Sequence, residues 1–172
     1  MNIILMGTRQ RGRVLRHFLA LSAEDRMLRF GHALSDEALI RLTASLDFKR
    51  DLFFGLVRGR QVLALAHLAL PPPNGHCQEA ELGLSVLAVA RGSGLGSKLF
   101  ARAVLESRRL GVCRLFMHCL ASNQAMLHIA KKAGMEIVRR AGEADAYLKL
   151  PRTPAAGLAP PLLTPEQAQR RR

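Results

Sequence analysis

The chain has 172 residues, enough for one folded domain with a single core and few for two. Apolar residues make up 49% and charged residues 23%, which excludes a disordered composition, and no run approaches the roughly 20 apolar residues that cross a bilayer. The formal net charge of +13 favours anionic partners, namely nucleic acid, acidic protein surfaces or phosphate-bearing cofactors, without choosing among them.

The first half of the chain contains two predicted helices and two predicted strands. Helical spacing of apolar residues predicts helices over residues 12–21 and 35–46. Strands follow over residues 51–58 and 61–70, separated by a tight Arg-Gly-Arg turn. We expect these two strands to form a hairpin.

Prolines mark one loop and one tail. Three prolines stand together at residues 71–73, and the other five lie between residues 151 and 165. We therefore expect a single folded domain over residues 1–150. Residues 151–172 form a proline-rich, basic tail that we expect to be flexible or to lie on a partner.

The second half alternates strands and helices. A strand is predicted over residues 79–86, with Glu79, Glu81, Gly83 and Ser85 on one face and apolar residues on the other. A helix then runs from Leu95 to a glycine cap at Gly111. The remaining predictions are a strand over 114–120, a helix over 123–133 and closing strands over 136–140 and 146–150. This order of elements is typical of an α/β domain with a mixed sheet.

Cysteine spacing and the start of the chain bear on its location. Cys77, Cys113 and Cys119 form no CxxC pair and no cluster with zinc spacing, and an odd number argues against a disulfide framework. The first residues lack the order of a secretory signal, because the apolar stretch precedes the basic one. We expect a cytoplasmic protein with reduced thiols, no metal site and no membrane partner.

A glycine-rich turn joins the alternating strand to the next helix. Gly92, Gly94 and Gly96 allow the backbone to approach a ligand, and the amides of residues 93–97 point along the helix axis at its positive end. The turn therefore predicts a site for a phosphate-bearing ligand. The Walker and dinucleotide patterns are absent. Taken alone, the turn is equally compatible with a tight strand-to-helix connection that binds nothing.

The segment Arg-Gly-Ser-Gly-Leu-Gly at residues 91–96 resembles the pyrophosphate signature Arg/Gln-x-x-Gly-x-Gly/Ala of the GNAT superfamily of N-acetyltransferases. The resemblance implies a mixed, largely antiparallel sheet flanked by helices and splayed at the cofactor strand, with acetyl-CoA in the gap. The cofactor-binding residues that it implies are Leu84, Val86, Arg91, Gly92, Ser93, Gly94, Leu95, Gly96, Ser97 and Asn123.

Two further segments extend the resemblance. SNQAMLHIAKKAGMEI is similar to the closing helix of the family, in which Asn123 would contact the pantetheine arm; Asn123 is also a plausible helix N-cap, and both roles can hold together. With LSAEDRMLRFG, the chain resembles the bacterial protein-lysine acetyltransferase branch. The family places acceptor contacts on its first two helices, which implies a part for Arg26, Arg29 and Phe30 in the acceptor site.

The catalytic candidates are Glu81 and Asn123. An amine with a pKa near 10.4 is neutral only about one part in a thousand at neutral pH, so a base is needed. Glu81, on the face of the strand away from the core, is the candidate base, and an exposed carboxylate without such a role is the alternative. Many family members carry a general-acid tyrosine four residues before the glycine that ends the last helix; here that position is Ala130.

These observations lead to one expected function and two alternatives. We expect acetyl transfer from acetyl-CoA to a primary amine, of a protein lysine or a small molecule, by direct attack in a ternary complex, with a homodimer as the state that the resemblance implies. A CoA-binding regulatory domain without chemistry is one alternative, which Ala130 favours. A basic nucleic-acid-binding protein is the other, although the chain has only eight aromatic residues, seven Phe and one Tyr.

Overall fold

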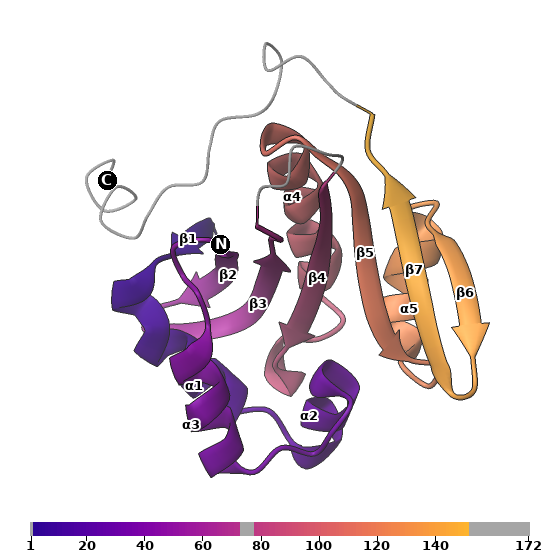
Figure 1. Cartoon of the computed structure of the whole chain (residues 1–172). Coiled ribbons are helices and arrows are strands. Elements are labelled where there is room, and N and C mark those ends of the chain that lie inside the picture. Colours follow the sequence, from indigo (N-terminus) through magenta and orange to yellow (C-terminus); the bar gives the residue numbers. More distant parts are fainter. Residues whose placement is uncertain (1, 73–77, 152–172) are drawn as a thin grey trace.

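A computed structural model describes residues 2–72 and 78–151 as a mixed sheet with helices on both faces (Figure 1). The strands are β1 (Ile3–Met6), β2 (Leu52–Arg58), β3 (Gln61–Ala69), β4 (Gln78–Val86), β5 (Val112–Leu120), β6 (Glu136–Arg140) and β7 (Glu143–Lys149). The helices are α1 (Arg11–Leu19), α2 (Ala23–Phe30), α3 (Asp36–Ser45), α4 (Leu95–Arg109) and α5 (Gln124–Lys132), with 3₁₀ turns at Thr8–Gln10 and Ala88–Ala90.

The seven strands lie in the order β1-β2-β3-β4-β5-β7-β6, and every neighbouring pair is antiparallel except β4 with β5. This arrangement confirms the expected α/β fold with a largely antiparallel sheet. Helices α4 and α5 cover one face of the sheet, and α1, α2 and α3 lie on the other (Figure 1). The parallel pair stands at the centre, where α4 forms the crossover between its strands.

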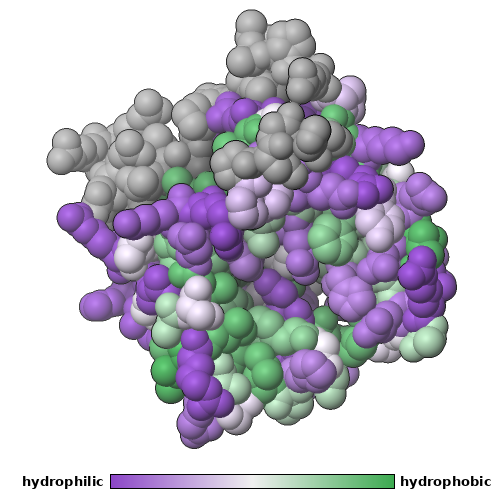
Figure 2. Space-filling view, viewed as in Figure 1, coloured by the Kyte–Doolittle hydropathy of each residue, from purple (hydrophilic) through white to green (hydrophobic). Residues whose placement is uncertain are grey.

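The core fills both faces of the central strands. Phe53, Leu65 and Leu82 on the sheet and Leu99 on α4 are at most 1% exposed. Figure 2 shows hydrophilic residues over much of one face of the molecule, with hydrophobic residues gathered in its lower part. Met27 on α2 and Ile40 on α3 are among the exposed hydrophobic side chains.

Most predicted elements are present within a few residues of their expected bounds, but β1 and α2 were not predicted. β1 is four residues long and pairs only with β2, so it is too short for alternation to show. α2 carries ordinary helix signals, because Ser22 accepts a hydrogen bond from Asp25 N and Gly31 ends the helix with a φ of 76°. These residues belong to the family motif LSAEDRMLRFG, and no helix was predicted over them.

The cysteines differ from expectation. Cys113 is disulfide-bonded, so the expectation of a reduced thiol is wrong at this residue, whereas Cys119 is free and buried. Two segments lie outside the described residues, namely residues 73–77, which include Cys77 and part of the proline loop, and the tail over residues 152–172. Leu150 N donates to Cys113 O at 2.7 Å, so ordered pairing reaches the expected end of the domain. Within the described ranges, no helix is long and apolar enough to cross a membrane.

Candidate active site

Strands β4 and β5 separate in the middle of the sheet. Their parallel pairing runs only from Gln78 to Glu81 on β4. On its other edge, β4 stays paired with β3 as far as Val86. The last five residues of β4 therefore have a strand neighbour on one edge and a gap on the other (Figure 1).

The register of β3 and β4 determines which backbone groups face this gap. Leu87 N donates to Leu63 O at 2.9 Å. From this pair the register continues without a shift to Ala69 opposite Glu81. In an antiparallel pair, residues that bond across the ladder alternate with residues whose N–H and C=O point away. Leu84 and Val86 consequently direct their backbone groups away from β3 and into the gap, where the predicted cofactor contacts require them.

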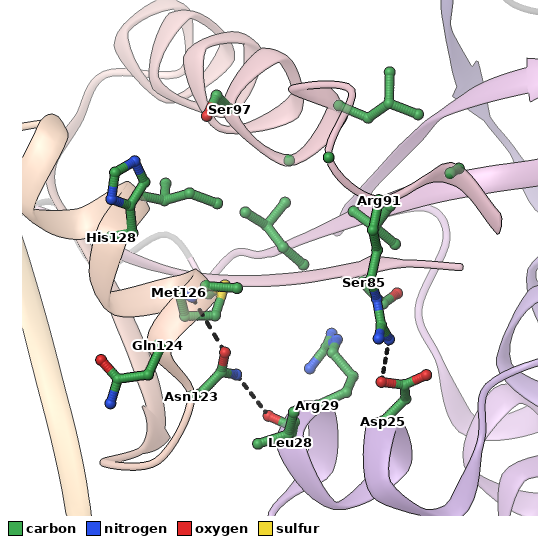
Figure 3. A pocket seen from close by; sticks show the side chains of 18 of the residues that line it. Asp25, Leu28, Arg29, Ser85, Arg91, Ser97, Asn123, Gln124, Met126 and His128 are labelled. Carbon is green, nitrogen blue, oxygen red and sulfur yellow. Dashed lines mark hydrogen bonds and ion pairs between the residues drawn. The ribbon is translucent and has the colours of Figure 1, made fainter. Parts of the chain in front are cut away.

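A cavity of about 460 Å³ lies beside this unpaired edge (Figure 3). It is bounded by the end of β4, the glycine turn, the start of α4, the start of α5 and the inner face of α2. Nine of the predicted cofactor residues line it: Leu84, Val86, Arg91, Gly92, Gly94, Leu95, Gly96, Ser97 and Asn123. Ser93 does not, because its Oγ turns back to donate to Ala90 O at 2.6 Å. Glu81 is exposed and lies outside the lining.

The glycine turn has the geometry of an anion site. Gly92 and Gly94 both adopt a φ of 73°, which side chains other than glycine rarely tolerate. No side chain caps the first amides of α4, a helix of 15 residues, so these donors are open to a ligand at the positive end of the helix. A Cβ on Gly96 would lie 3.1 Å from Ile129 Cδ1, so glycine there permits the close approach of α5.

Asn123 joins the two helices that flank the cavity. Its Oδ1 accepts from Met126 N at 3.1 Å, and its Nδ2 donates to Leu28 O at 3.2 Å. The side chain therefore is the N-cap of α5 and ties that helix to α2. Each amide atom has capacity for one further hydrogen bond, so a ligand contact is compatible with the cap.

The sequence matches the Acetyltransferase (GNAT) family over residues 19–135, more than half of the chain. The chain belongs to the GNAT acetyltransferase family. It is therefore a GNAT-type N-acetyltransferase, an enzyme class that uses acetyl-CoA. The match covers the gap, the glycine turn and the cap at Asn123.

Solved GNAT structures share the fold at low sequence identity. The GNAT domain of S. lividans PAT superposes with a TM-score of 0.72 at 21% identity, covering 86% of this chain and 89% of that one. The ribosomal-protein-alanine N-acetyltransferase of Brucella melitensis gives 0.67 at 19% identity, over 87% and 100% of the two chains. Salmonella typhimurium yncA, solved with its cofactor acetyl-CoA, gives 0.69 at 14% identity, over 92% and 99%.

Helix α2 supplies a wall of the cavity, although the sequence predicted no cofactor contact from its residues. Asp25 on α2 forms an ion pair with Arg91 of the glycine turn, so a carboxylate neutralises the first residue of the pyrophosphate signature (Figure 3). Arg29 lines the cavity from the same helix. Arg26 does not; it donates to backbone carbonyls around α2, including Leu34 O at 2.8 Å. Phe30 packs against the core instead.

A buried histidine reaches the cofactor strand from α1. His17 Nδ1 lies 2.8 Å from Val62 O, which can only accept, so Nδ1 carries the proton. His17 Nε2, 2.8 Å from Ser85 Oγ, must then accept from the Ser85 hydroxyl. Burial lowers the pKa of His17 to about 4, so the imidazole is neutral. Ser85 lines the cavity, and sequence reasoning missed its role.

A buried core residue, Ala130, stands at the position of the family's general-acid tyrosine. Ala130 is 1% exposed and does not line the cavity. Tyr147 lies on β7, where the Arg114 guanidinium stands 5.2 Å from its ring centre. Among the described residues, no tyrosine lines this cavity. Protonation of a thiolate leaving group at this site therefore relies on water or another group.

Proposed function

We propose that the chain moves an acetyl group from acetyl-CoA to a primary amine in a ternary complex formed in the gap between β4 and β5. The observation that carries this proposal is the unpaired edge of β4 beside a cavity that ends at the glycine turn. A pantetheine arm has amide groups spaced along its length and can pair with Leu84 and Val86 as an added strand would. Acetyl-CoA fits the donors and acceptors present.

The glycine turn is the proposed pyrophosphate site. The backbone amides from Gly92 through Ser97 lie at the positive end of α4. Each charge-assisted hydrogen bond to a phosphate there contributes about 1.5–3 kcal/mol. Ser93 would take part only through its backbone, since its hydroxyl is bound to Ala90 O. Arg91 adds positive charge at the same place once a phosphate competes with Asp25 for its guanidinium.

The reaction is direct attack of a neutral amine on the thioester carbon. The new C–N bond forms, the oxyanion receives a hydrogen bond from an amide of β4 near Val86, and the C–S bond then breaks. The amine nitrogen loses its proton to Glu81 through water, since Glu81 lies outside the cavity lining. The departing thiolate takes a proton from water. Asn123 positions the cofactor between α5 and α2 rather than transferring protons.

Two acceptor classes are proposed, the lysine of a protein and a small-molecule amine. The resemblance of LSAEDRMLRFG to the protein-lysine branch supports the first. The cavity, which α2 lines with polar side chains that a small ligand can reach, supports the second.

The test is thermal unfolding of three proteins with increasing acetyl-CoA: wild type, Gly94→Glu and Gly111→Glu. Gly94 and Gly111 have φ values of 73° and 71°, so both variants carry similar backbone strain, but only Gly94 lines the cavity. Ligand at 100 times Kd stabilises a protein by about 2.7 kcal/mol. We expect this gain in wild type and Gly111→Glu and its loss in Gly94→Glu.

Absence of a shift in the wild type would overturn the proposed cofactor site. An equal shift in Gly94→Glu would place the ligand elsewhere. Acetyl-CoA binding without turnover over a broad panel of primary amines would overturn the proposed acceptor class.

A further inference from the structure

The guanidinium of Arg29 lines the cavity without an anionic partner. Within residues 2–72 and 78–151, no hydrogen bond or ion pair engages it, and its contact is with the Phe30 ring, whose centre lies 5.1 Å away. Its neighbours differ, because Arg26 pairs with Asp36 and Arg91 pairs with Asp25. A half-buried guanidinium left unpaired in this way is a site for an incoming anion.

Strand β4 makes room for the Arg29 guanidinium at Gly83. A Cβ at Gly83 would overlap the Arg29 guanidinium, so the charge lies directly against the backbone of β4. Gly83 stands three residues before Val86, about 10 Å along the strand and further still from the glycine turn. The pyrophosphate of the cofactor is therefore not the expected partner of Arg29. The guanidinium belongs to the end of the gap where the thioester would lie.

Ser85 presents a complementary group on the same face of β4. Its hydroxyl proton is donated to His17, so its oxygen lone pairs are the part left to interact with a ligand. Ser85 lies two residues after Gly83, about 7 Å along the strand. A hydrogen-bond acceptor and a cationic donor thus stand side by side in the cavity wall (Figure 3).

No free carboxylate of the described lining compensates the Arg29 charge. Asp25 is the one acidic residue there, and it is engaged by Arg91. Glu81 favours the charged form of Arg29, yet burial outweighs it and lowers the pKa of Arg29 to about 10. A carboxylate brought by the acceptor would supply the missing partner in bidentate geometry.

We infer that the acceptor is a small amine that carries a carboxylate, an amino-acid-type substrate, bound with its carboxylate on Arg29 and its amine on Ser85. This inference rests on the proposed function and names the substrate class of the same site. Ser85 Oγ accepts from an amine N–H and so holds the nitrogen near the thioester. The nitrogen then bonds to the acetyl carbon, the C–S bond breaks, and the proton lost by nitrogen leaves through water.

The test compares amino acids with the amines made by removing their carboxylates: leucine with isopentylamine, phenylalanine with phenethylamine, and lysine with cadaverine. Calorimetry measures binding of each to the CoA-loaded protein, and initial rates measure kcat/KM with acetyl-CoA. In at least one pair we expect the amino acid to have a kcat/KM at least tenfold higher than that of the matching amine. In Arg29→Gln this ratio falls toward one through a raised KM, while Arg29→Lys retains part of it.

Gly83→Ala is the second variant, since it keeps the Arg29 charge but displaces the guanidinium, the movable end of a flexible side chain. It should lose the carboxylate preference with an unchanged Kd for acetyl-CoA. Arg29→Gln should likewise keep this Kd and should not lower the melting temperature, because it removes an unpaired, desolvated charge.

The possible results distinguish failure of the proposed function from failure of the inferred acceptor class. A wild type that binds no acetyl-CoA overturns the proposed function and this inference together. If the wild type binds acetyl-CoA but binds none of the acceptors, or binds amino acids no better than the matching amines, the inference alone is overturned. The same holds if Arg29→Gln weakens binding of the amino acid and of its matching amine equally.

Discussion

His17 is a buried histidine held neutral between α1 and β4. Its two ring nitrogens bond to Val62 O and Ser85 Oγ, and it is 2% exposed. Desolvation by burial is the largest cause of its lowered pKa, and the nearby charge of Arg29 acts in the same direction. Protonation in the folded state would cost it the hydrogen bond from Ser85. The residue therefore links the position of a cavity hydroxyl to the stability of the whole domain.

The pH dependence of stability follows from this pKa. The folded pKa of about 4 lies below the ordinary histidine pKa of 6.5, so the unfolded chain takes up the proton first as pH falls. The contribution is fully present above about pH 6.5 and is lost between pH 6.5 and 4. We expect the wild type to lose about 3 kcal/mol more than His17→Gln over this window, measured by urea unfolding.

His118 supplies a control of opposite sign. Its pKa is raised, chiefly by the hydrogen bond to Asp145, so its contribution is present at low pH and lost as pH rises. His118→Gln should therefore lose stability relative to wild type below pH 6.5 rather than gain it. Identical pH profiles for wild type and His17→Gln would contradict the account of the buried histidine.

Helix α2 lines the cavity from the side opposite α4. Asn123 ties it to α5 through Leu28 O, and the Asp25–Arg91 ion pair ties it to the glycine turn. In the proposed pyrophosphate site, Asp25 is thus an anion that would compete with a phosphate for Arg91. Helix α2 therefore both orders the cavity wall and offsets the positive charge of Arg91.

Removing this competition should tighten cofactor binding. We expect Asp25→Asn to lower the Kd for acetyl-CoA about 3–10-fold at low salt, with a smaller gain at high salt because screening weakens both interactions. The measurement is calorimetric titration. Asp36→Asn is the matched control, since it removes the exposed partner of Arg26 away from the cavity and should leave the Kd unchanged. Weaker binding in Asp25→Asn would show instead that the ion pair positions the glycine turn.

Local signals made the cofactor strand, the glycine turn and the cap at Asn123 predictable, because each depends on residues a few positions apart. The Asp25–Arg91 and His17–Ser85 contacts join residues 66 and 68 positions apart, and no short pattern reports them. Ser93 shows the reverse case. Its place in the motif suggested a ligand contact, yet its hydroxyl satisfies a carbonyl within the turn.

At the scale of the molecule, one departure from regular pairing creates the site. An antiparallel sheet with one parallel pair opens where β4 and β5 diverge, and helices from both faces line the opening. The net charge of +13 favours an anionic cofactor, although it would equally attract nucleic acid. Charge alone therefore does not decide the function, while the unpaired edge of β4 is specific to an extended ligand.

Residue-resolved amide exchange by NMR, with and without saturating acetyl-CoA, tests this claim most directly. The amides of Leu84 and Val86 point into the gap and should exchange rapidly in the free protein and slowly in the complex. The amides of Gly83 and Ser85 face β3 and serve as the internal reference, protected in both states. Unchanged exchange at Leu84 and Val86, with protection appearing elsewhere, would contradict cofactor binding in the gap.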